Sequence, residues 1–267
     1  MMRVVILGAG GHGQVVADIL LRMHERTNSV EPIGYLDDRP ALFGQKFLGL
    51  PVLGSIAALG SVSYDAAVVG VGDNATRRRL YELLRSNGIE LATARHPDSV
   101  IAPDVTVGPG TMVCAGAVIG ASSVIGSNCI VNTSCSIDHH DQIGDHVHIA
   151  PGVHLGGDVV VSDGAMVGIG SIVLPRSRIG AWSLVGAGSL VLGDVPEAIT
   201  VTGKPARPMR RRLRAVRVQT EERAPLSVRR EPTDWRLLAG SELVDRAQGR
   251  SVSSRMAKRS GTAREGR

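Results

Sequence analysis

The chain has 267 residues, of which 43% are hydrophobic but only 3% are aromatic. Its 33 glycines favour narrow, repetitive β structure over a bundle of helices. No apolar run approaches the roughly 20 residues that span a bilayer, and the N-terminus does not resemble a signal peptide. An odd number of cysteines without a paired CxxC motif indicates reduced thiols: Cys114, Cys129 and Cys135. We therefore expect a cytoplasmic protein without a membrane span.

The net charge of +5 is unevenly distributed. Residues 210–267 contain 16 Lys and Arg against 7 Asp and Glu, which leaves the preceding residues with a net charge of −4. We expect residues 210–267 to form a basic, largely disordered tail. An arm that binds nucleic acid or an anionic membrane is the alternative, but no aromatic residues alternate with the basic ones for base stacking. No nucleic-acid partner is therefore expected.

Residues 1–98 alternate between strand-like and helix-like segments. A predicted strand over residues 2–7 runs into a glycine-rich turn at 8–13, and a helix follows over 14–23. Further strands are expected at 32–36 and 66–70, with a charged helix at 76–86. This order predicts a small Rossmann-like α/β domain with a parallel sheet. The turn matches the G-x-G-x-x-G pattern, and such a turn at the start of a helix offers free N–H groups to a phosphate.

Residues 99–209 contain a repeat of six. Aliphatic residues recur at every sixth position without a break: Ile101, Val107, Val113, Ile119, Ile125, Val131, Ile137, Ile143, Ile149, Leu155, Val161, Val167, Val173, Ile179, Val185 and Val191. The residue four positions later is small or Val, with Asp141 as the exception. A helix requires a period near 3.6 and a simple strand a period of 2. A period of six predicts a left-handed parallel β-helix with one hexapeptide on each side of a triangular coil.

Three hexapeptides make one coil, so residues eighteen apart should stack. His139 lies two residues after Ile137, and Gly157 lies two residues after Leu155. Gly157 should therefore stack on His139, where a glycine permits close approach and can present its N–H group.

Four stretches, in this order, resemble one family. They are 8–13 (GAGGHG), 36–38 (LDD), 132–139 (NTSCSIDH) and 203–206 (GKPA). Between about residues 4 and 209 the chain resembles the hexapeptide-repeat acetyltransferases of the NeuD-like (sialic acid O-acetyltransferase) and PglD-like (UDP-amino-sugar N-acetyltransferase) type. The resemblance implies a homotrimer, acetyl-CoA in a groove between neighbouring coils, and a sugar acceptor held by the N-terminal domain. Surface-polysaccharide or glycan synthesis is the expected role.

The resemblance also implies roles for individual residues. His139 matches the family's general base, Gly157 its oxyanion donor, and His148 a histidine near the acetyl group. An unperturbed histidine titrates near neutral pH, which suits a base. Positions matching contacts to acetyl-CoA are His148, Gly157, Ile169, Gly186 and Ala187. Positions matching the nucleotide-sugar site are Gly10, Gly11, His12, Asp37, Asp38 and Gly72.

The sequence departs from the family directly after the base. The family commonly has a carboxylate there, whereas this chain has His140 followed by Asp141. We expect Asp141 or Asp138 to take over the carboxylate's role, with Asp141 as the candidate catalytic residue.

Other classes of protein remain open. A zinc enzyme of carbonic-anhydrase type would use a cluster of histidines: His139, His140, His146, His148 and His154. An NAD-linked oxidoreductase would explain the glycine turn but not the repeat, and a non-catalytic scaffold would explain the altered motif. The acetyltransferase is favoured, with no metal expected. The residues do not distinguish N- from O-acetylation or identify the sugar.

Overall fold

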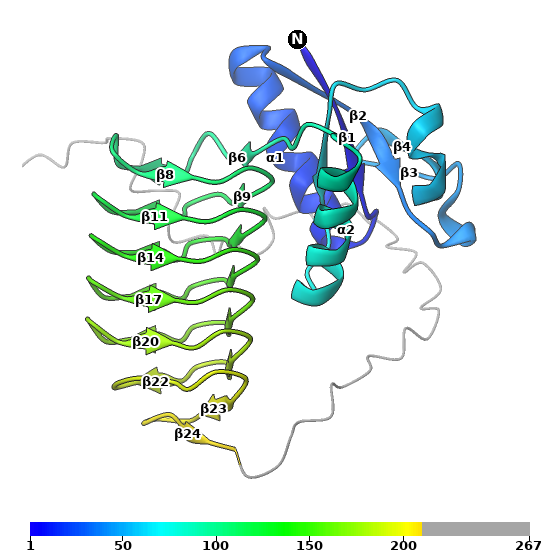
Figure 1. Ribbon diagram of the computed structural model, residues 1–267. Helices are drawn as coiled ribbons and strands as arrows, with labels where there is room; N and C mark the ends of the chain where they lie inside the picture. The colour runs from blue at the N-terminus through cyan, green and yellow to red at the C-terminus, as the bar shows by residue number, and fades with distance from the viewer. Residues whose placement is uncertain (210–267) are drawn as a thin grey trace, which may run out of the picture. The chain divides into compact units, whose positions relative to one another are not determined.

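The computed structural model describes residues 1–209, so the predicted basic tail at 210–267 lies outside the described residues. The described chain contains an N-terminal α/β domain followed by a coil of short strands (Figure 1). Neither helix of residues 1–209 has the length and hydrophobicity that crossing a bilayer requires.

The N-terminal domain is a five-stranded sheet with two helices. The strand order is β3-β4-β2-β1-β5, and β1 pairs in parallel with both β2 and β5. The elements are β1 (Met2–Leu7), α1 (Gly11–Thr27), β2 (Val30–Leu36), β3 (Lys46–Phe47), β4 (Leu50–Gly54), β5 (Ala66–Val69) and α2 (Asn74–Ser86). The Rossmann-like prediction is confirmed. The sequence analysis missed the β3–β4 hairpin and two 3-10 helices, η1 (Pro40–Leu42) and η2 (Ile56–Ser61).

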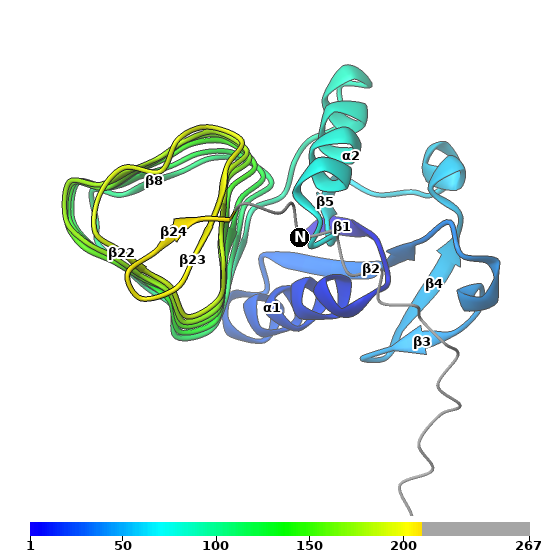
Figure 2. The same ribbon diagram turned by 90° about the horizontal axis from the view of Figure 1, so that it is seen from below.

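The remaining strands form three parallel sheets, which are the sides of a triangular coil (Figure 2). We name each sheet after one of its strands. The β15 sheet contains β6 (Ala94–Arg95), β9 (Met112–Val113), β12 (Ile130–Val131), β15 (His148–Ile149), β18 (Met166–Val167), β21 (Leu184–Val185), β23 (Thr200–Thr202) and the antiparallel β24 (Arg207–Pro208). The β13 sheet contains β7 (Val100–Ile101), β10 (Val118–Ile119), β13 (Ser136–Ile137), β16 (His154–Leu155), β19 (Ile172–Val173) and β22 (Leu190–Val191). The β14 sheet contains β8 (Thr106–Val107), β11 (Val124–Ile125), β14 (Gln142–Ile143), β17 (Val160–Val161) and β20 (Arg178–Ile179).

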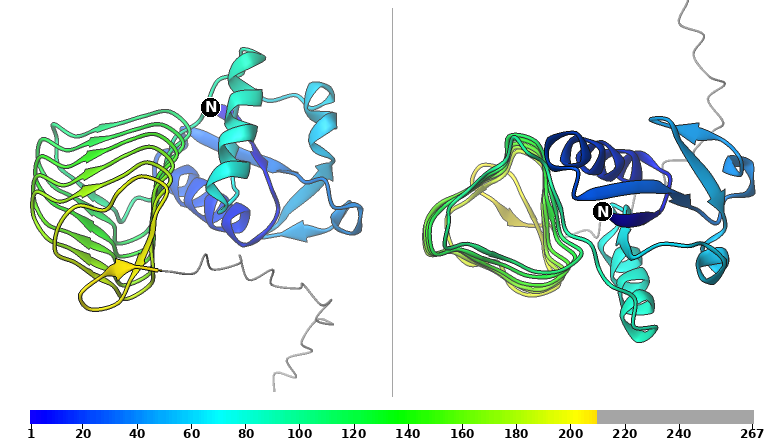
Figure 3. Two further views of the ribbon diagram at one scale, coloured as in Figure 1. Left: turned by 60° about the horizontal axis from the view of Figure 1, so that its bottom comes forward. Right: turned by 90° about the horizontal axis from the view of Figure 1, so that it is seen from above.

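The register of these sheets confirms the left-handed β-helix. Ile119 pairs with Ile137, and Val167 pairs with Val185, so each strand lies on the strand eighteen residues before it. The aliphatic residues of the repeat fill the interior of the coil, and stacked outlines of successive coils are visible in Figure 3. The small residues four positions later are also buried. Some of them bind backbone: the Thr111 hydroxyl donates to the Gly126 carbonyl and accepts from the Cys129 N–H.

The corners of the coil demand left-handed backbone conformations. Gly164 has a φ of +67°, and a Cβ atom there would collide with the ring of Trp182. Gly152 has a φ of +63° but open space around it. Substitution at Gly152 therefore measures the cost of the left-handed backbone conformation alone. Substitution at Gly164 adds the cost of a steric clash.

We predict that Gly152→Ala lowers the free energy of unfolding by about 1 kcal/mol, the cost of a left-handed alanine. Gly164→Ala should cost about 2–4 kcal/mol because the clash with Trp182 adds to the same conformational cost. Chemical denaturation of both variants measures the difference. Equal losses would mean that Trp182 moves away freely.

Candidate active site

His139 lies on an exposed corner of the coil, between the β13 and β14 sheets. Its backbone N–H donates to Asp138 Oδ1 over 2.8 Å, and the next residue, His140, turns the chain with a φ of +60°. The Nδ1 atoms of His139 and His140 are 3.0 Å apart, and the two rings meet edge to face. One of these nitrogens donates to the other. His140 is thus the side chain that contacts His139 in place of a carboxylate.

Asp141 is fully buried at the same corner. Its Oδ2 accepts from the Asp138 N–H over 3.0 Å, and its Oδ1 accepts from the Val159 N–H over 2.8 Å. Burial raises the pKa of this carboxyl group to about 7, and the two N–H donors oppose the shift. Within residues 1–209 no hydrogen bond joins Asp141 to the His139 imidazole. Asp141 therefore supports the loop that carries His139 and ties it to the next coil.

Gly157 lies against the His139 ring, where the register predicts it. The Asp158 N–H donates to the His139 carbonyl over 3.0 Å, and a Cβ at Gly157 would lie 2.5 Å from Cε1 of His139. Any larger residue would displace the imidazole. Gly157 is buried, and its N–H has no acceptor among the described residues.

His148 lies elsewhere, on the β15 sheet where the N-terminal domain packs. It is 5% exposed, and its Nε2 is 3.1 Å from the side-chain nitrogen of Asn132. Its ring meets the His12 ring edge to face at 5.5 Å, and neither Nδ1 has a partner among the described residues. Burial, followed by the charge of Arg77, lowers the pKa of His148 to about 3. The pKa of His12 is lowered for the same two reasons, so both imidazoles are neutral near pH 7.

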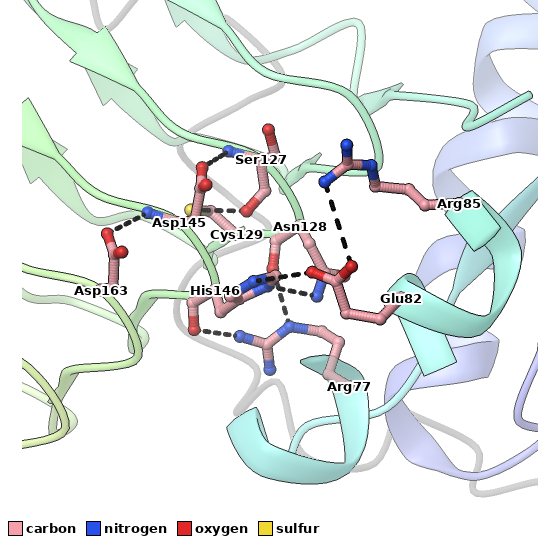
Figure 4. Close-up of polar contacts among 9 residues, drawn as sticks. All are labelled: Arg77, Glu82, Arg85, Ser127, Asn128, Cys129, Asp145, His146 and Asp163. Atoms are coloured by element: carbon pink, nitrogen blue, oxygen red, sulfur yellow. Dashed lines mark hydrogen bonds and ion pairs between the residues drawn. The ribbon is translucent and has the colours of Figure 1, made fainter. Parts of the chain in front are cut away.

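A buried arginine joins the N-terminal domain to the coil (Figure 4). Arg77 of α2 is fully buried, and burial lowers its pKa to about 10. Its Nε donates to the Asn128 carbonyl over 2.9 Å, and its Nη2 donates to the His146 carbonyl over 2.7 Å. Its Nη1 donates to the carbonyls of Val71 and Gly72. The same guanidinium thus fixes the loop after β5 and the coil segment leading to His148.

The glycine turn of the N-terminal domain begins α1. Gly10 is the N-cap and uses no side chain, and the first turn contains no acidic residue. A Cβ at Gly72 would collide with the His12 ring, so glycine is required where that ring approaches the loop after β5. Gly11 is exposed beside this turn. The arrangement leaves the first N–H groups of α1 available to an anion.

Both aspartates at the end of β2 already have partners. Arg39 donates from Nε and Nη2 to the two carboxylate oxygens of Asp37, each over 2.8 Å. The hydrogen bond from Arg39, together with the Ala9 N–H, lowers the pKa of Asp37 to about 2. Asp38 accepts from the Ile56 N–H over 2.9 Å. The Arg39 guanidinium is exposed near Gly10, so its remaining N–H groups can meet a ligand at this edge, as can the exposed Asp38 carboxylate.

Three of the positions that match acetyl-CoA contacts lie on a third edge, between the β15 and β13 sheets. Ile169 is 60% exposed, Ala187 is exposed, and the Gly188 N–H donates to the Ile169 carbonyl over 2.7 Å. A Cβ at Gly186 would lie 2.7 Å from the Thr202 hydroxyl oxygen. These residues form a stacked, solvent-exposed edge.

The structure thus brings the predicted residues together in three groups. His139, Gly157 and Asp141 share one corner of the coil. His12, Gly72 and His148 meet where the N-terminal domain packs on the coil, and Gly10, Gly11, Asp37 and Asp38 lie at the strand ends and glycine turn of that domain. The third edge carries Ile169, Gly186 and Ala187. The sequence analysis did not single out Arg39 or Arg77. Arg77 belongs to a run of three arginines that reads as a charged helix face, and nothing in that run distinguishes the buried member.

Comparison with known proteins defines the class. Residues 3–84 match the PglD N-terminal domain family. The acetyltransferase domain of PglB from Neisseria gonorrhoeae is 33% identical, with a TM-score of 0.73. The match covers 78% of this chain and 100% of that domain. PerB from Caulobacter crescentus, solved with CoA and GDP-perosamine, is 37% identical, with a TM-score of 0.71, 77% of this chain covered and 96% of that one. WeeI from Acinetobacter baumannii is 27% identical, with a TM-score of 0.70. The match covers 78% of this chain and 100% of WeeI. No curated protein matches in sequence.

These matches identify an acyltransferase built on a hexapeptide coil. The chain belongs to the PglD-like family of sugar acetyltransferases. The matches do not support the oxidoreductase, zinc-enzyme or scaffold alternatives. Of the five histidines of the supposed zinc cluster, only His139 and His140 share a corner, and the other three lie on other sides and corners of the coil.

The buried His148 predicts a pH-dependent stability. Its folded-state pKa of about 3 lies below the ordinary value of 6.5, so the unfolded chain binds the extra proton between these values. The free energy of unfolding should fall as the pH is lowered from 7 to 5, by up to about 2 kcal/mol from this residue. His148→Gln, which keeps a polar group facing Asn132, should reduce that loss. An unchanged pH dependence in the variant would contradict the prediction.

Proposed function

We propose that this chain transfers the acetyl group of acetyl-CoA to the amino group of a nucleoside-diphosphate-linked amino sugar. The observation that carries the proposal is the exposed His139 ring against Gly157, whose N–H has no acceptor in the described chain. The CoA and GDP-perosamine bound to PerB, and the acetyl-CoA bound to the gonococcal domain, support the two substrate classes.

The chemistry follows from the groups on this corner. The amine nitrogen attacks the thioester carbonyl carbon, and the His139 imidazole takes the proton that the nitrogen loses. The Gly157 N–H donates to the oxyanion of the tetrahedral intermediate. Collapse of the intermediate breaks the carbon–sulfur bond and releases CoA, whose thiolate takes up a proton. His140, through its contact with His139 Nδ1, orients the base, and Asp141 holds the loop.

The acceptor's nucleotide would bind at the glycine turn. The free N–H groups at the start of α1 suit the diphosphate, with Gly10, Gly11 and the exposed Arg39 around it. Asp38 and Gly72 lie at the ends of the neighbouring strands. By the family resemblance, the neutral imidazoles of His12 and His148 would lie near the sugar and the acetyl group.

A homotrimer completes the site. Within one chain, His139 lies at the corner between the β13 and β14 sheets, whereas His148 lies on the β15 sheet and Ile169 on the edge beyond it. A whole side of the coil separates the base from the edge that carries Ile169. Packing of parallel coils around a threefold axis would bring the base of one protomer to the acetyl-CoA and sugar sites of its neighbour. Exposed apolar residues on the outer face of the β13 sheet suit such an interface: Val100, Val118 and Ile172.

Acetyl transfer can be tested by following CoA release with a thiol reagent. The chain's own cysteines are buried, and burial raises the pKa of each thiol to about 12, which keeps the background low. The acceptors are GDP-perosamine, UDP-linked amino sugars and sialic acid. We expect release with one nucleotide amino sugar and a loss of about 10²–10⁴-fold in His139→Ala. His24→Ala, at a histidine near the C-terminal end of α1, is the control. Release with sialic acid alone would instead indicate O-acetylation.

Mixing of two inactive variants tests the shared site. If His139 and His148 of different protomers build one site, mixed trimers of His139→Ala and His148→Ala contain some sites with both histidines intact. We expect the refolded or co-expressed mixture to regain activity that neither variant has alone. If both histidines of one chain served the same site, mixing would restore nothing. Sedimentation analysis of each variant verifies that the trimer itself survives.

A further inference from the structure

The corner that carries His139 also holds a set of metal-binding donors. His139, His140 and Asp158 each offer one ligand atom, and these atoms all lie within 4.8 Å of one another. All three side chains are exposed. We propose that this cluster binds a zinc ion, and that the bound zinc blocks acetyl transfer by occupying the His139 imidazole. The inhibition rests on the proposed function, whereas the binding does not.

The backbone holds the three donors in place. His139 and His140 are adjacent, and Asp158 lies one coil further on, tied to the His139 carbonyl by its own N–H over 3.0 Å. His140 and Asp158 have nearly the same left-handed φ, +60° and +61°, as stacked corner residues of a regular coil should. Positions fixed by this stacking lose little further freedom when an ion binds.

The spacing and chemistry of the donors suit zinc. Nitrogen ligands lie about 2.0–2.1 Å from zinc, so two of them on one tetrahedral ion are about 3.3 Å apart. The Nδ1 atoms of His139 and His140 are 3.0 Å apart, and rotation of the exposed Asp158 side chain can close the remaining distance. Two imidazoles and a carboxylate are a common set of three protein ligands, with the fourth position left to water.

The surrounding charges are mixed. Arg176 and Arg178 line the same groove as His140 and Asp158, and their charge weakens the attraction for a dication. No ion pair within residues 1–209 joins either arginine to Asp158, so its carboxylate is available. Two further carboxylates offset the arginines: Asp138 beside His139, and Asp104, whose charge interacts with His140. We therefore expect reversible binding, weaker than in a closed structural site.

Zinc bound to either ring nitrogen of His139 prevents the imidazole from accepting a proton. If the metal takes Nε2, the lone pair is occupied directly. If it takes Nδ1, the neutral ring carries its proton on Nε2 and has no lone pair left to accept another. The base is thus lost by coordination at either atom.

Direct binding is measured first, with the full chain stripped by chelation and titrated with zinc chloride in a calorimeter. We expect one zinc per chain, and at least tenfold weaker binding in His140→Gln and in Asp158→Asn. His154→Gln is the matched control, because His154 is an exposed histidine outside the cluster, and it should bind zinc like the unaltered chain. Mg²⁺ should not compete, since it prefers oxygen ligands. Binding that is absent, or equal in all variants, overturns the proposal.

Inhibition is measured separately, as CoA release with and without zinc. We expect zinc to suppress acetyl transfer at the concentration that fills the site, and chelation to restore it. Zinc that binds at the cluster without reducing turnover would refute the inhibition. A chain that binds zinc at these residues but transfers no acetyl group with any acceptor would contradict the proposed function and leave the metal site standing. Thermal unfolding verifies that each variant is folded.

Discussion

The stacking of each coil on the one eighteen residues before it is the constraint on which the rest of this structure depends. The strands of the coil are only two or three residues long, so a single coil forms too few hydrogen bonds to persist alone. Successive coils supply the missing partners and bury an unbroken column of aliphatic side chains. Each such side chain contributes roughly 1.5–3 kcal/mol by leaving water. A shift in register would expose that column and misplace every corner.

The same constraint creates the chemistry of the corner. Because residues eighteen apart stack, a glycine at 157 brings backbone against the His139 ring, and the buried Asp141 can join two successive coils. The backbone that carries the imidazole and the Gly157 N–H is therefore held by hydrogen bonds between stacked coils. In the proposed reaction the Gly157 N–H would need little reorientation when the oxyanion forms. Donors fixed in this way are also well placed for a metal ion.

One buried cation, the Arg77 guanidinium, joins the N-terminal domain to the coil. Within residues 1–209, Arg77 has no buried carboxylate as its partner, and backbone carbonyls from both domains accept its hydrogen bonds. Its charge helps to keep His12 and His148 neutral. Neutral imidazoles can donate one hydrogen bond and accept another, which suits the recognition of sugar hydroxyl and carbonyl groups. The contact that joins the domain to the coil thus adds to the effect of burial in lowering the pKa of both imidazoles.

The sequence by itself determined the coil, because a period of six constrains side chains one by one and needs no knowledge of distant contacts. It also determined the stacking of Gly157 on His139, since the two positions are eighteen residues apart, which is the length of one coil. The sequence could not show that Asp37 is already paired with Arg39, or that Arg77 is the buried member of its run of three arginines. Nor could it show that His140 rather than Asp141 contacts the His139 ring. Those outcomes depend on which side chains converge after folding, where burial and competing hydrogen bonds decide between residues that look equivalent in the sequence.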